Sequence, residues 1–298
     1  MNLHEEPVFD LCRLPTEVLC HIFIHLPQTD YMLPPNSKSP PMLLTRICRR
    51  WREVALDMPS LWCRLTMKID YWNWRQAVFC YDSWLKRAQG RPLSLEITRI
   101  KNDTTDLRTL LQPYTSQIFS LKVEFDSASL RAVAPEILLS DLPALQELQV
   151  VIHALFKTRD TLSPVLTAIS RLFTLRSLNF EALDCHAIER LSHLNLTNID
   201  LYKSNPTNII NLLQKFPTLS SLKIEMLVDD GLPCEPFTHS TIQLLSIQGN
   251  VRGPFHPAVP LVRLFNALTL PNLRVLRVEG GSWPCVEDLI SHYRHVVK

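Results

Sequence analysis

The sequence predicts an α/β protein: a short N-terminal helical module, then a longer run of strand–helix repeats whose strands form one parallel sheet. Three observations predict this. Residues 14–26 form an unusually apolar helix, a six-residue strand pattern recurs after residue 91, and helix-like stretches separate its later copies. Because a strand followed by a helix returns the chain to the same end of a sheet, such alternation favours parallel pairing.

The helix expected over residues 14–26 is apolar around most of its circumference. Residues four apart lie together on a helix surface, and only the row Glu17, His21 and His25 is polar. A surface helix usually carries one apolar stripe somewhat over 100° wide. This helix therefore lies either deep in a large core or under another protein. The proline-rich stretch that follows favours a small module, and so a covering partner.

A second helical pattern covers residues 42–56, with apolar side chains on one side and four arginines on the other: Arg46, Arg49, Arg50 and Arg52. Asp57, Pro59 and Ser60 end it, and Leu61 and Trp62 follow as large apolar anchors. The arginines have three interpretations. We favour the solvated face of an amphipathic helix over steering towards an acidic partner and over contact with nucleic acid phosphates.

The order of these elements resembles the F-box. The residues that carry the resemblance are Leu14, Pro15, Glu17, Val18, Leu19, Ile22, Phe23 and Leu26, then Cys48, Arg49, Arg50, Trp51, Arg52, Leu61 and Trp62. The string SPPMLLTRICRRWREVALDMPSLWCRL is especially similar to F-box-like proteins of mushroom-forming fungi. The insertion at 28–41 is longer than in compact F-boxes.

The resemblance implies a three-helix F-box-like domain over residues 11–66 that docks to the small acidic Skp subunit of SCF-type cullin ubiquitin ligases. The alternative is a plain helical hairpin whose tryptophans only pack the core. The residues expected to contact the Skp subunit are Leu14, Pro15, Val18, Leu19, Ile22, Phe23, Leu26, Trp51, Leu61 and Trp62.

Residues 67–90 are expected to link the module to the repeats. Within them, residues 72–89 have helical spacing of apolar side chains, and Gly90 suits the position after a helix C-terminus. The junction WLKRAQGRPLSLEI also resembles the corresponding part of the fungal proteins.

From residue 91 to 298 a pattern recurs: apolar, two variable, apolar, one variable, apolar. Its eight copies begin at Pro92, Ile118, Leu145, Leu175, Leu196, Leu219, Ile242 and Leu273, between 21 and 31 residues apart. Leucine-rich repeats are roughly 20 to 29 residues long. Helix-like stretches lie at 161–173, 205–216 and 260–270. We therefore expect an irregular leucine-rich-repeat solenoid with a parallel sheet on its concave face; an ordinary α/β domain is the alternative.

The variable strand positions are expected to form two columns across the concave face. One reads Thr98, Glu124, Val151, Glu181, Tyr202, Glu225, Gln248, Glu279, and the other Glu96, Lys122, Gln149, Asn179, Asp200, Lys223, Ser246, Arg277. The first is acidic and could bind a basic or polar segment of a target, with Glu181, Tyr202, Glu225 and Gln248 as contacts. For most positions a solvated face balanced by lysines is the preferred interpretation.

Composition excludes several function classes. The net charge of +2 gives no general attraction to nucleic acid, and the chain has no apolar run long enough to span a membrane. With no signal peptide expected, the compartment is the cytoplasm or nucleus. Glycines number 6 of 298, too few and too scattered for a phosphate-binding loop. The 8 cysteines are scattered too, so we expect no metal site. The sequence contains neither a hydrolase nucleophile motif nor a zinc-helix motif, and we therefore expect no catalytic residue and no cofactor.

The sequence thus indicates a substrate-receptor subunit rather than an enzyme. The module would dock to the Skp subunit and, through it, to the cullin core, while the repeats present an unknown protein target. The alternative is a repeat scaffold that binds proteins without a ligase role.

Overall fold

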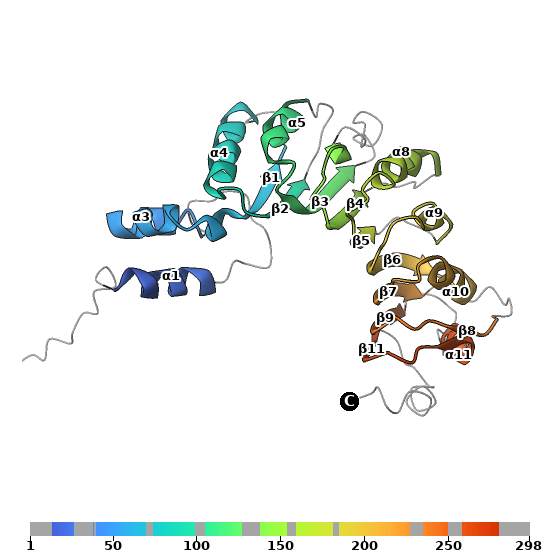
Figure 1. Cartoon of the computed structure of the whole chain (residues 1–298). Coiled ribbons are helices and arrows are strands. Elements are labelled where there is room, and N and C mark those ends of the chain that lie inside the picture. Colours follow the sequence, from blue (N-terminus) through green and yellow to red (C-terminus); the bar gives the residue numbers. More distant parts are fainter. Residues whose placement is uncertain are drawn as a thin grey trace, which may run out of the picture.

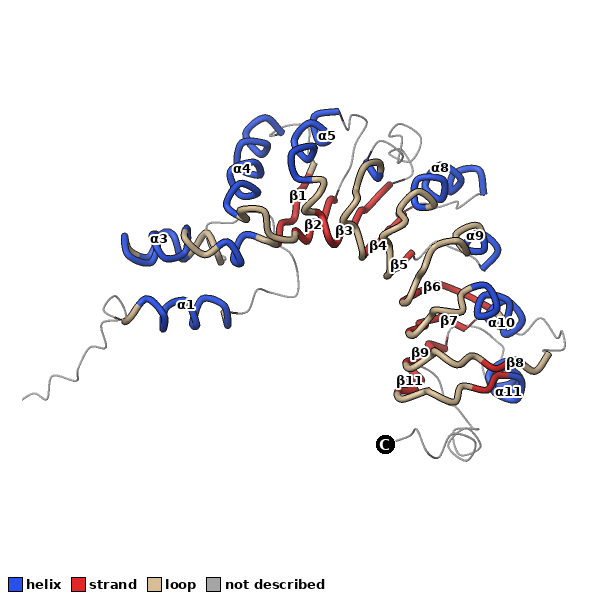
Figure 2. The backbone as a smooth tube through the Cα atoms, viewed as in Figure 1, coloured by secondary structure: helices blue, strands red, loops and turns tan. Residues whose placement is uncertain are grey.

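A computed structural model describes residues 14–26, 38, 40–69, 74–98, 105–126, 138–153, 159–180, 185–226, 235–249 and 258–279. The chain forms an arch, with the N-terminal helices at one end and the strands following one another in chain order (Figure 1). Strands line the inner side of the arch and helices the outer side (Figure 2). Most of the predicted insertion at 28–41 lies outside the described residues.

The N-terminal module, as we use the term below, consists of α1 (Thr16–His25), α2 (Leu44–Ile47), α3 (Arg49–Leu56) and the 3-10 turn η2 (Pro59–Trp62). The second helical pattern is not continuous. Cys48 is extended, with φ −151° and ψ 171°, and separates α2 from α3. Its Sγ accepts a hydrogen bond from the Trp51 backbone N–H at 3.4 Å. The thiol thus caps α3 by satisfying one of the N–H groups that a helix start leaves without a partner.

Nine parallel strands form the main sheet in simple chain order. They are β1 (Arg64–Lys68), β2 (Leu93–Thr98), β3 (Ile118–Asp126), β4 (Glu147–His153), β5 (Ser177–Phe180), β6 (Asn198–Ser204), β7 (Ser221–Met226), β9 (Leu244–Gly249) and β11 (Val275–Glu279). The second and third apolar positions of all eight copies lie on the eight strands of the main sheet that follow β1, which confirms the predicted parallel α/β sheet. The pattern did not predict β1, because Leu65, Thr66 and Met67 are buried in succession instead of alternating. This strand crosses the predicted boundary between residues 66 and 67.

Helices connect the strands. They are α4 (Trp74–Arg87), α5 (Thr105–Leu111) with the 3-10 turn η3 (Gln112–Tyr114), α8 (Arg159–Ile169), α9 (Cys185–Glu189), α10 (Pro206–Lys215) and α11 (Ala258–Ala267). The helices expected over 72–89, 161–173, 205–216 and 260–270 correspond to α4, α8, α10 and α11, with ends shifted by a few residues. Helices α5 and α9 were not expected. Strands β8 (Phe237–Thr238) and β10 (Leu268–Thr269) pair separately near α11.

The apolar positions of the pattern build the core between sheet and helices. In the copy that contains β5, Leu175, Leu178 and Phe180 are at most 1% exposed. Full burial of each such side chain stabilises the fold by about 1.5–3 kcal/mol. One repeat cannot enclose these side chains alone, so each depends on its neighbours.

Hydrogen bonds also join the repeats where the strands begin. The Gln146 carbonyl accepts from the N–H groups of both Arg176 (2.8 Å) and Ser177 (2.9 Å), and the Arg176 carbonyl accepts from Thr197 (2.8 Å) and Asn198 (3.0 Å). The same double acceptance continues at the carbonyls of Thr197, Ser220 and Gln243. From β4 onwards, each repeat is therefore fixed to the next at the edge of the sheet where strands start.

Side chains support this edge through a feature that the apolar pattern does not contain. Thr218 Oγ1 donates to the Leu196 carbonyl at 3.0 Å, and Thr241 Oγ1 to the Leu219 carbonyl at 2.7 Å. Thr174 does the same with the Leu145 carbonyl at 2.8 Å. Each of these threonines directly precedes the first apolar position of a copy, and this recurrence could have been read from the sequence.

Candidate docking surfaces

The inner side of the N-terminal module is an aromatic core. Leu19 and Phe23 of α1 are 0% and 1% exposed, and the Phe23 ring lies 5.0 Å from the ring of Trp51 on α3. Leu61 and Trp62 are buried at the base of the module. These five residues were expected to contact a partner. Because the chain itself encloses them, in this conformation they instead hold α1, α3 and η2 together.

The outer side of the module presents apolar side chains. Val18 is 42% exposed, Ile24 53%, Leu43 39% and Ile47 48%. On α1, Val18 and Ile24 flank the polar row Glu17, His21 and His25, as their helical spacing requires. The outer side of α1 is thus not enclosed by its own chain. This agrees with the expectation that a partner covers the helix, but it does not identify that partner.

The other expected contact residues lie at intermediate depth or on the surface. Pro15 is exposed, and Leu14, Ile22 and Leu26 are half-buried against the core. Of the ten expected contact residues, Pro15 and Val18 are therefore the exposed ones. Leu43 and Ile47 were missed because the second helical pattern was assigned a single inward face.

Polar groups border the module. Arg49 Nε lies 2.9 Å from Glu53 Oε1, and Arg52 Nε donates to the Thr45 carbonyl at 2.7 Å. A groove of about 670 Å³ separates the start of α1 from α3, and it is lined by Thr16, Cys20, Arg49, Arg50, Glu53, Val54, Asp57 and Met58. The Trp51 indole Nε1 is buried and has no acceptor among the residues described.

Two tryptophans fix the module to the sheet. Trp62 Nε1 donates to the Ala55 carbonyl at 2.9 Å, and Trp84 Nε1 of α4 donates to the Trp62 carbonyl at 2.9 Å. The two rings meet edge to face at 4.9 Å, and the Arg87 guanidinium lies 4.6 Å from the centre of the Trp62 ring. Buried hydrogen bonds of this kind hold a single geometry, so the module has a defined orientation relative to the first strands.

On the inner face of the arch, the second predicted column is confirmed. Strand pairing aligns Glu96, Lys122, Gln149, Asn179, Asp200, Lys223, Ser246 and Arg277 in one row. Many of its polar groups bond to one another. Lys122 Nζ lies 2.6 Å from Glu96 Oε1 and 3.3 Å from Glu124 Oε1. Burial lowers the pKa of Lys122, but its bonds to the two carboxylates outweigh this and raise it overall.

The same balance continues along the row. Asn179 Nδ2 donates to Asp200 Oδ2 at 2.9 Å, and Lys223 Nζ lies 3.7 Å from the same oxygen. Charges along this row are therefore largely balanced within the sheet, which favours the solvated interpretation for these positions.

The four predicted target contacts are only partly brought together. Glu225 pairs in register with Gln248, and Gln248 with Glu279, whose Oε2 accepts from Gln248 Nε2 at 3.0 Å. The backbone of Tyr202 lies in β6, but its side chain and all of Glu181 lie outside what the structure describes. Glu225 and Gln248 are thus neighbours on the inner face, and the other two positions stay predictions.

Within the described part of the chain, no three His, Cys, Asp or Glu side chains gather closely enough to bind a metal ion. His21 and His25 do lie face to face, with ring centres 6.5 Å apart. None of the described helices has the length and apolar character needed to cross a bilayer.

Comparison with protein families matches residues 11–68 to the F-box-like family. These residues include the whole N-terminal module and all of β1. The chain therefore contains an F-box-like domain at its N-terminus. Comparison with curated proteins finds no match.

Proposed function

We propose that this chain is a substrate-receptor subunit of an SCF-type cullin ubiquitin ligase. Its F-box-like domain would dock to the Skp subunit, and the curved sheet would present a protein target. The observation that carries the proposal is the combination of the F-box-like match with the four exposed apolar side chains of the module. F-box domains generally bind Skp subunits, and exposed apolar clusters commonly mark protein interfaces.

Charge favours the same partner. The module carries four arginines on α2 and α3, and the Skp subunit is acidic. Rim charges of this kind mainly accelerate association and set orientation. Binding energy would come from the apolar side chains that the partner covers.

We further infer that the strand–helix units are irregular leucine-rich repeats forming a solenoid. Support comes from the chain-order parallel sheet, the strands on the inner side of the arch and the repeat spacing. No residue of the chain needs to be catalytic in this role. Its contribution is proximity, because the joint formed by Trp62 and Trp84 would hold a bound target in a fixed position relative to the ligase core.

The target would lie along the inner face, with Glu225, Gln248, Tyr202 and Glu181 as its contacts. Glu225 is the strongest of these, because no ion pair or hydrogen bond within the described part of the chain involves its carboxylate. A specific target that still binds after Tyr202→Ala is combined with Glu225→Lys would count against this strip.

Co-purification with a Skp subunit tests the docking step. We expect Val18→Asp, Ile24→Asp or Ile47→Asp to weaken binding at least tenfold, because each places a charge where the partner must be apolar. Phe79→Asp is the matched control, since Phe79 is 74% exposed but lies on α4, outside the module. Trp51→Ala is less informative, because that side chain is buried and its loss would also disturb folding.

The proposal fails if the wild-type chain does not bind the Skp subunit, or if all three module variants bind as well as the Phe79→Asp control. Circular dichroism of each variant separates lost docking from lost folding. Assembly with a cullin then distinguishes a ligase receptor from a scaffold, since a scaffold would bind its target without recruiting the cullin.

A further inference from the structure

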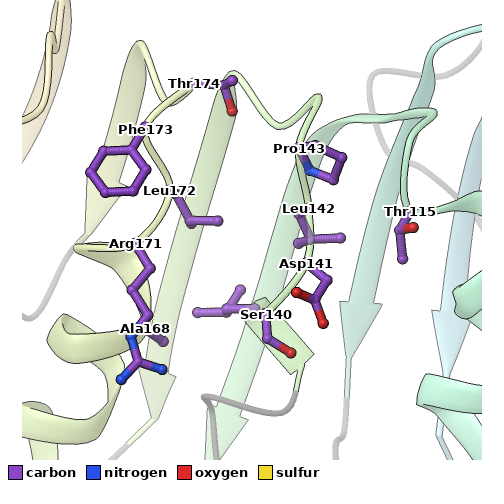
Figure 3. Close-up of a pocket in the computed structure, with 11 residues that line it drawn as sticks. Thr115, Ser140, Asp141, Leu142, Pro143, Ala168, Arg171, Leu172, Phe173 and Thr174 are labelled. Atoms are coloured by element: carbon purple, nitrogen blue, oxygen red, sulfur yellow. The ribbon is translucent and has the colours of Figure 1, made fainter.

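A second surface lies on the edge of the sheet where the strands begin. The turn before β4 and the turn before β5 leave a groove of about 650 Å³ between them (Figure 3). We call it the turn groove. Neither the F-box-like domain nor the predicted strip on the inner face includes any of its residues.

The floor of the turn groove is apolar. It consists of Leu139, Leu142, Ala168 and Leu172, all at most 5% exposed. Phe173 lies at its side and is 71% exposed. A phenylalanine this exposed leaves a large apolar area in water at the rim of the groove, with its ring turned away from Leu142 (Figure 3).

Phe173 is held in place. Its backbone N–H bonds to the Arg171 carbonyl at 3.2 Å, and its ring meets that of His193 edge to face at 6.2 Å. His193 in turn is fixed by a 2.8 Å hydrogen bond between Nε2 and the Ser170 carbonyl. A preorganised aromatic side chain loses little conformational entropy on binding, which suits it to anchor a partner.

Two charged residues, Asp141 and Arg171, line the turn groove. Asp141 on one side is 3.7 Å from Arg108 Nη2, so a positive charge already accompanies it. On the other side Arg171 is exposed, and no ion pair within the described part of the chain involves its guanidinium. Of these two charged residues, Asp141 is thus accompanied by Arg108, and Arg171 is the one available to the carboxylate of a partner.

We propose that the turn groove binds an acidic peptide segment of a partner protein. A large apolar side chain of the segment fills the space between Leu142 and Leu172, the segment continues over Phe173 at the rim, and a neighbouring carboxylate pairs with Arg171. An arginine fork matches carboxylate geometry, and the apolar floor selects a peptide over a nucleic acid backbone. The identification of this segment as part of a ligase target rests on the proposed function; the binding itself does not.

Fluorescence polarisation on the purified full chain tests the proposal, using three labelled twelve-residue peptides. The first carries a central leucine flanked by aspartates, the second replaces the aspartates by lysines, and the third replaces the leucine by serine. We expect the first to bind at least tenfold more tightly than the other two. Arg171→Glu should remove this preference and favour the lysine peptide, while Phe173→Ala should weaken binding of the first at least tenfold. Arg190→Glu, the same charge change on an exposed residue outside the groove, should leave binding unchanged.

Several results would overturn the proposal: equal binding of the acidic and basic peptides, no binding of the first, or an affinity that Arg171→Glu leaves unchanged. Self-association of the wild-type chain that Phe173→Ala abolishes in sedimentation velocity would also overturn it, because a second copy would then occupy the groove. Skp co-purification is measured separately. If the chain does not co-purify with the Skp subunit but still binds the first peptide, the ligase role is refuted and the proposal for the turn groove is retained.

Discussion

Replacing Trp62 by alanine should unfold the joint between the F-box-like domain and the sheet. The side chain is 0% exposed, its Nε1 donates to the Ala55 carbonyl at 2.9 Å, and its ring packs against Trp84 at 4.9 Å. Truncating a fully buried tryptophan to alanine costs about 3–5 kcal/mol, which includes the cavity that remains. Such a loss is a large fraction of the roughly 5–15 kcal/mol by which domains are stable.

A second variant separates packing from hydrogen bonding. Trp62→Phe keeps most of the ring contact but leaves the Ala55 carbonyl without its donor, which should cost about 1–3 kcal/mol. Urea unfolding followed by far-UV circular dichroism measures both variants. Phe79→Ala, at a side chain 74% exposed, serves as control and should change stability by no more than about 0.5 kcal/mol.

The outcome also decides how Trp62 contributes to docking. Trp62 could support docking only indirectly, by stabilising the fold. In that case Trp62→Ala will lose Skp binding in proportion to its loss of stability, and binding will be partly restored at low temperature. A cost below about 1 kcal/mol for Trp62→Ala would refute the reasoning, because such a value is typical of surface positions.

Three further predictions concern the repeats and the linker. Gly90 has φ 80°, and a Cβ there would meet no atom within 4 Å, so Gly90→Ala should cost only the backbone penalty of about 1 kcal/mol, seen as a lower thermal midpoint. Thr218→Val removes the donor to the Leu196 carbonyl at 3.0 Å and should cost about 0.5–1.5 kcal/mol in urea unfolding; a neutral or stabilising effect would show that this edge does not depend on the hydroxyl. Burial lowers the pKa of the His239 imidazole below its ordinary value of 6.5, although the Phe216 carbonyl opposes this. Below pH 6.5 the unfolded chain therefore takes up a proton that the folded chain does not, so stability should fall as pH drops through this range. Unfolding free energies measured between pH 7 and 5 should fall less steeply in His239→Gln than in wild type.

The sequence predicted the sheet well because its information is local. Each copy of the apolar pattern identifies its own strand, and the common register aligned Lys122 with Glu96 and Asp200 with Lys223 across strands distant in sequence. It missed β1 because three buried residues in succession have no period of two. It missed the break at Cys48 because a side-chain cap leaves no mark on apolar spacing.

The exposed surface of the N-terminal module was predicted less accurately than the fold, for a physical reason. Apolar periodicity shows which side chains avoid water but not whether the chain itself or a partner covers them. Phe23 and Val18 both look like contact residues, yet the first is 1% and the second 42% exposed. Whether Arg171 has an ion-pair partner depends on residues of other repeats, such as Asp141 and Arg108, which pair with each other. No single stretch of sequence shows that arrangement.

The carbonyls that accept two hydrogen bonds at the strand starts imply that neighbouring repeats of the arch are joined locally. From β4 to β11, each strand start is bonded to the next through the same kind of link, so each repeat in this part of the arch depends directly on its neighbours. A repeat gained or lost near β11 would alter the reach of the arm while the geometry around the tryptophan joint stayed intact. A chain of this design could therefore vary the far end of its sheet without changing the contacts that join the F-box-like domain to the first strands.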